Sequence, residues 1–260
     1  MVALRRTVSF LELIKFEHTV FALPFAYMGM LLAAEGWPTW DQFAWITVAM
    51  AAARTLAMSA NRLADASLDA RNPRTAQRPL VVGSISPSTV WIGGLLSAAA
   101  LAVAAYRLSP LAFRLLPGAL IFLVGYPFAK RFTILSHFLL GATDGLAPLG
   151  AWAAIRNDLG GSDALPAWIL FAIVTLWIGG FDLIYACQDV EFDRREGLHA
   201  VPARYGVRTA LRLSAVCHSL TSVLLAWLGL TAGLGGGTGL GWWSLPACWP
   251  TSMPSSGRTT

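Results

Sequence analysis

The 260-residue chain has little charge. Asp, Glu, Lys and Arg make up 13% of it, whereas soluble domains carry roughly 25%. Hydrophobic residues account for 56%, and the mean hydropathy is +0.59. Because so few charged side chains cannot cover the surface of a water-soluble globule, we expect an integral membrane protein that lies in a lipid bilayer.

Cysteine is scarce too, and strand-like alternation is missing. Cys187, Cys217 and Cys248 have neither metal-site nor redox spacing, and they do not indicate a disulfide. The ~10-residue alternating segments of a transmembrane β-barrel are absent. The expected fold class is therefore all-α, a polytopic transmembrane helical bundle.

Long apolar runs are what the chain has instead. Most of them reach the ~20 residues that a helix needs to cross a bilayer. The runs fall at 19–34, 42–60, 88–106, 110–128, 133–154, 166–187 and 210–233. We expect about seven spans in one transmembrane domain, residues 1–232, with the first run retained as a helix. The Gly/Pro/Ser-rich segment 233–260 is expected to be a disordered or aberrant tail.

Basic residues predict the orientation. Most of the 19 lysines and arginines lie before the first run or after the second, fourth and sixth runs. By the positive-inside rule, the N-terminus and these loops face the cytoplasm, as in a multi-pass protein of the cell inner membrane. This topology accounts for the net charge of +5, so no nucleic-acid partner is expected.

The acidic residues gather in two short windows. Of 14 acidic residues, six lie within 61–69 and 182–193, at the cytoplasmic ends of two apolar runs. Residues four apart share a helix face. Each window therefore predicts one polar stripe, and the members of the two stripes are Asn61, Asp65 and Asp69 in the first, and Asp182, Tyr185, Asp189 and Asp193 in the second.

Carboxylates next to lipid are costly and mark functional sites. Two facing stripes would suit Mg²⁺, which prefers oxygen ligands and bridges to substrate phosphates. An alternative for the first stripe is a solvated helix end whose acids pair with Arg62 and Arg71.

Basic and aromatic side chains near the windows are candidate substrate contacts. Arg74, Arg78, Lys130 and Arg131 would clamp an anion, since arginine matches phosphate oxygens, although positive-inside bias alone also explains them. Tyr126 and Tyr185 would contact a diphosphate or stabilise a cation through their rings, or they are ordinary interface tyrosines. The four histidines, His137 included, are interpreted as packing or interface residues.

These motifs resemble those of the UbiA superfamily of intramembrane prenyltransferases. The pattern Asn-x-x-x-Asp-x-x-x-Asp matches at 61–69, and Asp-x-x-Tyr-Ala-x-x-Asp-x-x-x-Asp matches at 182–193. The run at 74–80, and Tyr126 with 130–133, look like further family signatures. The likeness covers about 8–232. Residues 16–24 and 186–193 look like the 4-hydroxybenzoate polyprenyltransferase branch, and more narrowly like its menaquinone-pathway relatives.

The resemblance implies a ring of nine helices around a lipid-open cavity, of which this chain lacks the last two. The chain also has Lys15 and His18 where the family commonly has an arginine. The implied reaction moves a polyprenyl group from polyprenyl diphosphate to an aromatic acid, 4-hydroxybenzoate or a dihydroxynaphthoate, in ubiquinone or menaquinone biosynthesis.

The implied site has three groups of residues. Mg²⁺ would be held by Asp65, Asp69, Asp189 and Asp193. Asp182 would orient the acceptor. The substrate-binding residues would be Asn61, Arg74, Arg78, Tyr126, Lys130, Arg131 and Tyr185. A transporter, or a catalytically inactive truncated homologue, stays open as an alternative function; a transporter would more typically carry its charges at the bilayer midplane.

Overall fold

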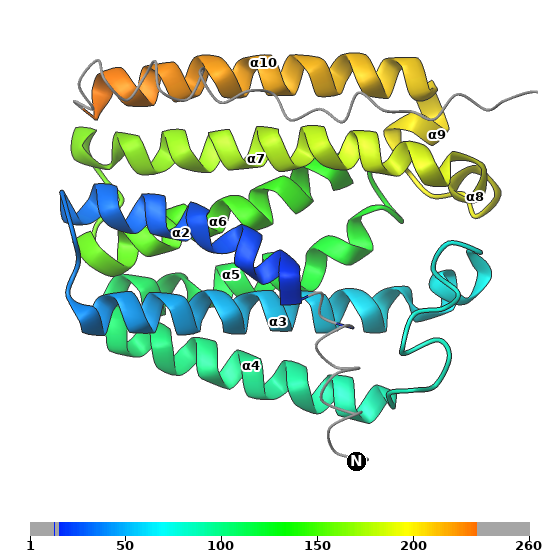
Figure 1. The fold of residues 1–260 in the computed structure, drawn as a ribbon, viewed down its shortest axis with the longest axis horizontal. Coiled ribbons are helices and arrows are strands. Elements are labelled where there is room, and N and C mark those ends of the chain that lie inside the picture. Colours follow the sequence, from blue (N-terminus) through cyan, green and yellow to red (C-terminus); the bar gives the residue numbers. More distant parts are fainter. Residues whose placement is uncertain (1–12, 14–15, 233–260) are drawn as a thin grey trace, which may run out of the picture.

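The computed structural model describes residue 13 and residues 16–232, and this part of the chain contains helices and no strand (Figure 1). Seven helices are long: α2 (Phe16–Ala34), α3 (Trp40–Arg71), α4 (Pro87–Leu108), α5 (Pro110–Ala129), α6 (Ser136–Arg156), α7 (Leu165–Tyr185) and α10 (Val207–Thr231). Four are short: η1 (Ser162–Ala164), η2 (Ala186–Asp189), α8 (Val190–Arg195) and α9 (Val201–Tyr205). The predicted all-α class is confirmed.

Each predicted apolar run corresponds to one long helix. Six candidate spans, which contain α3, α4, α5, α6, α7 and α10, are long and apolar enough to cross a membrane, and residues Ala22–Ala34 of α2 are apolar as well. Within the described residues no helix follows α10. The predicted segment 233–260 lies outside them.

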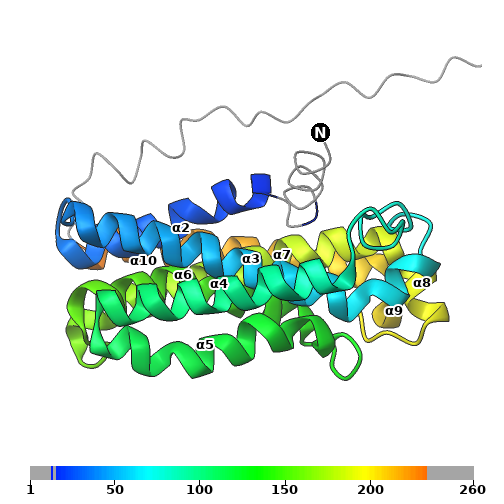
Figure 2. The same ribbon diagram turned by 90° about the horizontal axis from the view of Figure 1, so that it is seen from below.

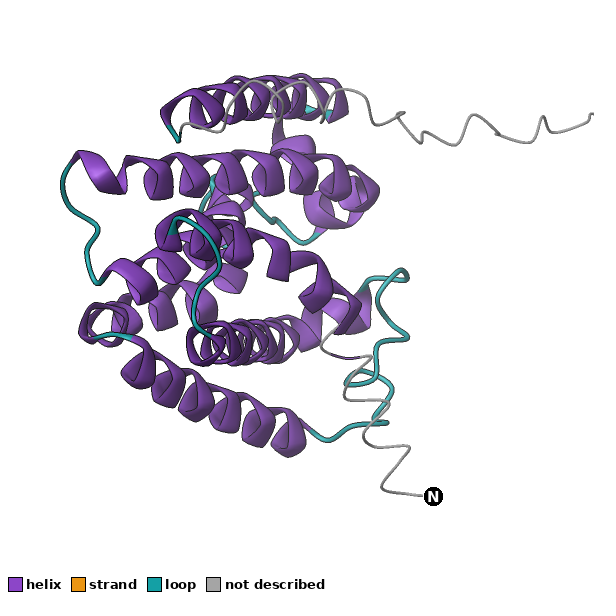
Figure 3. Ribbon diagram, turned by 60° about the vertical axis from the view of Figure 1, so that its left-hand side comes forward, coloured by secondary structure: helices purple, strands orange, loops and turns teal. Residues whose placement is uncertain are grey.

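The long helices run back and forth along one axis, so that loops gather at the two ends of the bundle (Figure 3). In Figure 1 the pair α3 and α4 forms one flank and the pair α7 and α10 forms the other, with α2, α5 and α6 between them. The ends of α3 and α7 lie at the same end of the bundle, together with α8, α9 and the loop 72–86 (Figure 2). Both aspartate windows therefore lie at one end.

Small residues let the central helix α6 approach its neighbours closely. A Cβ atom on Gly141 would lie 2.2 Å from the carbonyl oxygen of Thr175 on α7. A Cβ atom on Gly29 of α2 would lie 2.3 Å from the carbonyl oxygen of Pro148 on α6. Such contacts are typical of membrane helices, whose association depends on close packing. The α2–α6–α7 unit thus fixes where α7 delivers the second aspartate window.

The loop after α3 is a structured cap, as its prolines predict. The helix ends at Arg71, directly before Asn72 and Pro73, because proline disfavours the helical conformation of the residue before it. Turns fill 72–85. The next helix starts at Pro87 after Ser86, whose hydroxyl accepts from the amide of Thr89 at 3.2 Å. The loop is thereby anchored at both ends.

The prediction that the second window forms one helical stripe is wrong. The α-helix stops at Tyr185, the chain tightens into the 3₁₀ turn η2, and α8 begins at Val190. A 3₁₀ turn has three residues per turn, so it changes the direction in which later side chains point. The break falls where Asp189 is bonded from outside its own segment by Asn72 and Arg74.

Candidate active site

The first aspartate motif lies in the last turns of α3 and is buried. Asp65 is 4% exposed and Asp69 is 7% exposed. The Lys130 ammonium donates to Asp65 Oδ2 at 2.6 Å, and the Arg78 guanidinium donates to Asp69 Oδ2 at 2.6 Å. Each carboxylate is therefore neutralised by a residue from a different loop.

The alternative of a solvated helix end is wrong. In that alternative Arg62 pairs with an aspartate. In the structure Arg62 instead donates from Nε to the carbonyl oxygen of Leu13 at 3.2 Å. Arg71, the other proposed partner, forms a two-point pair with Glu196, with a closest contact of 2.8 Å. That pair joins the end of α3 to the end of α8.

The second motif is joined directly to the loop after the first. Asp189 accepts from Asn72 Nδ2 at 2.9 Å and from Arg74 Nε at 2.9 Å, and Arg74 also pairs through its second nitrogen. Arg74 further donates to the Tyr185 hydroxyl at 2.7 Å. The hydrogen bond to Asp189 raises the pKa of Arg74, so this guanidinium stays charged. The two windows therefore converge, as their shared membrane side predicts.

Asp182 and Asp193 differ from the other carboxylates. Asp182 Oδ2 lies 2.6 Å from Nδ1 of His137 on α6. Among the described residues, the Asp193 side chain forms no ion pair, and its main-chain oxygen accepts from the amide of Leu198 at 2.8 Å. Sequence reasoning interpreted His137 as a packing residue, and no spacing links it to a partner 45 positions away.

The remaining predicted residues are placed less uniformly. Arg131 lies 3.5 Å from Asp65 Oδ1, with its guanidinium over the Phe128 ring. The Asn61 carboxamide oxygen accepts a long hydrogen bond from Arg62, at 3.4 Å. Tyr126 packs against a buried apolar cluster of α3, α4 and α5, and within the described part of the chain its hydroxyl has no hydrogen-bond partner. Within the described residues, Tyr126 therefore makes no hydrogen bond to the charged cluster, by which we mean Asp65, Asp69 and Asp189 with Arg74, Arg78 and Lys130.

The carboxylates suit a metal chemically, although basic side chains pair with them. No group of three or more His, Cys, Asp or Glu side chains in the described residues is arranged to hold a metal ion. The donors are nevertheless all carboxylate oxygens, which Mg²⁺ prefers. Asp65 Oδ1 is buried and accepts no hydrogen bond from the described residues, and Arg131 lies 3.5 Å from it. An oxygen of this kind has capacity for one more positive ligand.

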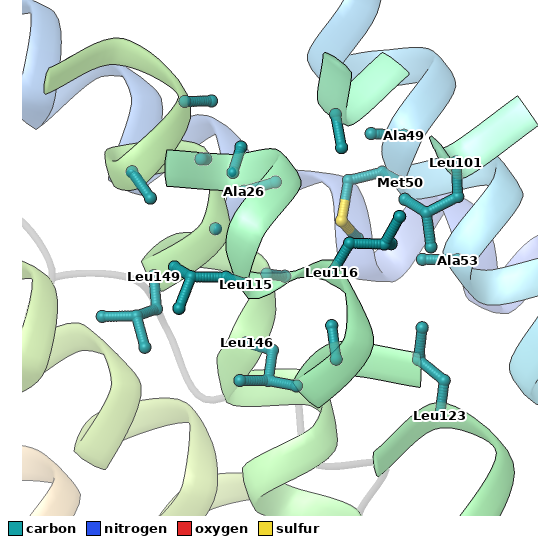
Figure 4. Close-up of a pocket in the computed structure, with 18 of the residues that line it drawn as sticks. Ala26, Ala49, Met50, Ala53, Leu101, Leu115, Leu116, Leu123, Leu146 and Leu149 are labelled. Atoms are coloured by element: carbon teal, nitrogen blue, oxygen red, sulfur yellow. The ribbon is translucent and has the colours of Figure 1, made fainter. Parts of the chain in front are cut away.

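A cavity of about 340 Å³ lies among α2, α3, α4, α5 and α6, and its lining is mainly alanine and leucine (Figure 4). Met50, Leu101 and Leu116 contribute to its wall in that view. Only two charged residues line it, Arg54 of α3 and Asp144 of α6, whose side chains pair at 3.1 Å.

The Arg54–Asp144 pair is a feature that the sequence interpretation did not use. Arg54 Nε is buried and has no hydrogen-bond partner in the described residues. The available signal was a single charged residue in the middle of each of two apolar runs, since such residues are expensive in a membrane. The two positions are 90 residues apart, so their pairing was not visible.

Comparison with known proteins decides the family. The model of the UbiA prenyltransferase family matches residues 22–254. The chain belongs to this family. It is 31% identical over 206 residues to a 4-hydroxybenzoate octaprenyltransferase of Vibrio vulnificus, covering 79% of this chain and 71% of that one. It is 33% identical over 208 residues to a 4-hydroxybenzoate solanesyltransferase of Synechocystis, covering 79% and 68%.

Solved structures agree with the family assignment. The apo structure of a UbiA homologue from Aeropyrum pernix K1 superposes with a TM-score of 0.79 at 37% identity, covering 85% of this chain and 81% of that one. A UbiA homologue from Archaeoglobus fulgidus bound to DMAPP and Mg²⁺ superposes with a TM-score of 0.68, covering 94% and 88%. At 18% identity the latter shows the fold alone. The UbiA resemblance read from the two motifs is confirmed.

Proposed function

We propose that this UbiA prenyltransferase transfers a polyprenyl group from polyprenyl diphosphate to an aromatic acid, with 4-hydroxybenzoate as the first choice of acceptor. One observation carries the proposal. The contacts of Asn72 and Arg74 with Asp189 join the loop after the first aspartate motif to the second motif, in a bundle that also holds an apolar cavity. A donor with a charged head and an isoprenoid chain matches that combination. The relatives' names support this acceptor, and dihydroxynaphthoate stays the alternative prediction.

The charged cluster would bind the donor's diphosphate. Arg74, Arg78 and Lys130 each hold a motif carboxylate in the structure, so they surround the place where a diphosphate would lie. We assign Mg²⁺ to Asp65, Asp69, Asp189 and Asp193, a choice supported by their carboxylate oxygens, which Mg²⁺ prefers. When bound, the metal supplies positive charge to the oxygens of the leaving diphosphate.

The reaction is a substitution on the aromatic ring. The bond between the allylic carbon and the diphosphate oxygen breaks, and the diphosphate leaves with the electron pair. Positive side chains that face the growing negative charge lower the barrier, because their orientation is already fixed. The ring carbon beside the phenolic hydroxyl then forms a bond to the allylic carbon, and this ring carbon gives its proton to the released diphosphate. The apolar wall of the cavity would keep water from an allylic cation that lies against it.

The acceptor's carboxylate would bind Arg54. Arginine binds carboxylates through paired N–H donors, and Arg54 Nε still has its donor free among the described residues. Asp144 neutralises Arg54 within the cavity wall, which lowers the cost of a charge among apolar residues. We further propose that the site faces the cytoplasm from the inner membrane, on the strength of the positive-inside rule.

Asp65→Asn, with the exposed Asp41→Asn at the other end of the same helix as a matched control, tests the function. Membranes with each variant are incubated with labelled polyprenyl diphosphate, Mg²⁺ and either 4-hydroxybenzoate or a dihydroxynaphthoate, and the product is identified by mass. We expect the wild type and Asp41→Asn to release diphosphate and prenylate one acceptor, and Asp65→Asn to lose at least about 100-fold in turnover, the scale of a lost electrostatic contact.

Two outcomes would contradict the proposal. Wild-type turnover by Asp65→Asn would remove the aspartate cluster from the reaction. A wild-type chain that prenylates neither acceptor would favour the inactive-homologue alternative.

A further inference from the structure

We propose that His137 is a positioning residue, which orients the Asp182 carboxylate and ties the start of α9 to the membrane helices. This inference rests on the proposed function only where it concerns turnover, since Asp182 is placed in the site by that proposal. The hydrogen-bond geometry stands independently of it.

His137 lies in the first turn of α6 and is 3% exposed. Its ring has two partners from two other segments. Nδ1 lies 2.6 Å from Asp182 Oδ2 on α7, and Nε2 accepts from the main-chain amide of Val201 at 3.2 Å. Val201 begins α9, whose N-cap residue makes no side-chain hydrogen bond. The first amides of a helix have no partner within it, so the histidine satisfies one that would otherwise be buried without a bond.

The two contacts fix the tautomer of the ring. A main-chain N–H can only donate, so Nε2 must be unprotonated in order to accept from Val201. The proton of the neutral ring therefore lies on Nδ1 and is donated to Asp182. Asp182 is the acceptor, and a separation of 2.6 Å is short even for a hydrogen bond to a charged group. The ring thus holds the first amide of α9 and one oxygen of the Asp182 carboxylate at fixed positions relative to each other.

Apolar residues adjoin both partners of the ring. Leu183, Val201 and Ala210 form a buried cluster, with Phe138 packed against it. A Cβ atom on Gly179 would lie 3.3 Å from the His137 carbonyl oxygen, so α6 and α7 are close at this level. Hydrogen bonds are stronger where water is excluded, and unpaired polar groups are more costly there. The contacts of His137 therefore set the local geometry and do more than fill space.

Asp182 is at the right place for its orientation to matter. It lies three residues before Tyr185, so the two share a face of α7, and Tyr185 accepts from Arg74 of the charged cluster. The Asp182 side chain is 27% exposed, which leaves part of the carboxylate open beside its histidine contact. The end of α7 thus carries one carboxylate oriented from α6 and one tyrosine oriented from the loop 72–86.

The first test needs no variant. In ¹⁵N NMR spectra of ring-labelled protein in lipid nanodiscs, His137 should show a protonated Nδ1 and an unprotonated Nε2 at neutral pH, and its signal is assigned by its loss in His137→Gln. A ring protonated on Nε2 alone, or on both nitrogens, would overturn the proposal, since either form prevents acceptance from Val201.

The second test compares two replacements with a control histidine. In His137→Gln the side chain still offers an acceptor for Val201 and a donor for Asp182, whereas His137→Leu offers neither. We expect hydrogen exchange at the Val201 amide to rise in the leucine variant and to stay near wild type in the glutamine variant. The control is His218→Leu on α10, where the ring contacts Ser214 of its own helix at 3.3 Å.

Kinetics separate positioning from packing. We expect His137→Leu to lower kcat about tenfold to hundredfold, the range for a lost hydrogen bond to a charged group, with an unchanged KM for polyprenyl diphosphate. His137→Gln should recover most of this loss. Equal activity of the leucine variant and the wild type, with unchanged exchange at Val201, would show a packing role only. If the proposed function is wrong, the wild type shows no turnover. The NMR and hydrogen-exchange results still support or overturn the role of His137 in that case.

Discussion

The two aspartate motifs are built differently. Asp65 and Asp69 lie on one unbroken helix, are buried, and face cations that come from other segments. Asp182, Asp189 and Asp193 are spread over α7, η2 and α8, and each has a different kind of environment: a histidine, an arginine with an asparagine, and no ion pair within the described residues. The first motif is thus positioned by its own helix, whereas the second is positioned by its partners.

The largest expected effect comes from the buried pair of the first motif. Asp65→Ala leaves the Lys130 ammonium without its partner next to apolar helices. We expect a loss of about 2–3 kcal/mol in stability, below the 3–5 kcal/mol of a fully buried pair because the Lys130 side chain is 33% exposed. Asp193→Ala, which breaks no ion pair, should stay within about 0.5 kcal/mol.

Thermal unfolding in detergent measures both variants, with turnover assayed in parallel. We expect both to lose turnover, since both aspartates are assigned to Mg²⁺. Equal stability losses in the two variants would break the distinction between the motifs.

A smaller effect should come from the contact that joins the motifs. Arg74→Ala removes the bonds to Asp189 and Tyr185, so that only Asn72 still holds Asp189 from the loop 72–86. We expect kcat to fall about tenfold to hundredfold, as for other lost charged hydrogen bonds, with an increased KM for polyprenyl diphosphate. Arg74→Lys should recover little, because one ammonium cannot reproduce the guanidinium contacts.

Arg71→Ala is the matched control for Arg74. Arg71 lies three residues earlier and pairs with Glu196 after α8, but its own side chain is 53% exposed, as in a surface ion pair. Such pairs contribute about 0–1 kcal/mol, so turnover should change by less than about fivefold. A larger loss of turnover for Arg71→Ala than for Arg74→Ala would mean that the contact at the end of α8, and not the contact at η2, supports the site.

The smallest effect tests whether helix continuity matters only in the first motif. Ser67→Gly places glycine on the exposed face of α3 between Asp65 and Asp69, at an expected cost of about 0.5–1 kcal/mol. Gln188→Gly places it in η2, which is already broken from the α-helix, and should cost less. Circular dichroism melting curves compare the two. The same cost at both positions would mean that η2 depends on helical propensity as strongly as α3 does.

Sequence patterns predicted the fold and much of the candidate site. Hydrophobic runs placed the long helices, and prolines at 73 and 79 placed the end of α3 and the cap. Convergence of the two windows followed from charge asymmetry, because loops on one membrane side share one end of a bundle. The break at η2 was not predictable, since the spacing of Asp182, Tyr185, Asp189 and Asp193 also fits a helix.

The contacts of His137 and of Arg54 with Asp144 were missed for a related reason. They depend on which helices are neighbours and on which of their residues lie at the same level along the bundle, and hydropathy encodes neither. Gly141 and Gly145 of α6 determine that packing, yet a glycine in an apolar run carries no mark of its partner.

The length of α3 has a consequence for the surrounding lipid. Its 32 residues rise about 48 Å, whereas the hydrocarbon core of a bilayer is about 30 Å thick. The helix must therefore tilt or extend beyond the acyl region, and either adjustment depends on bilayer thickness. The enzyme should for this reason respond to the acyl-chain length of its host membrane.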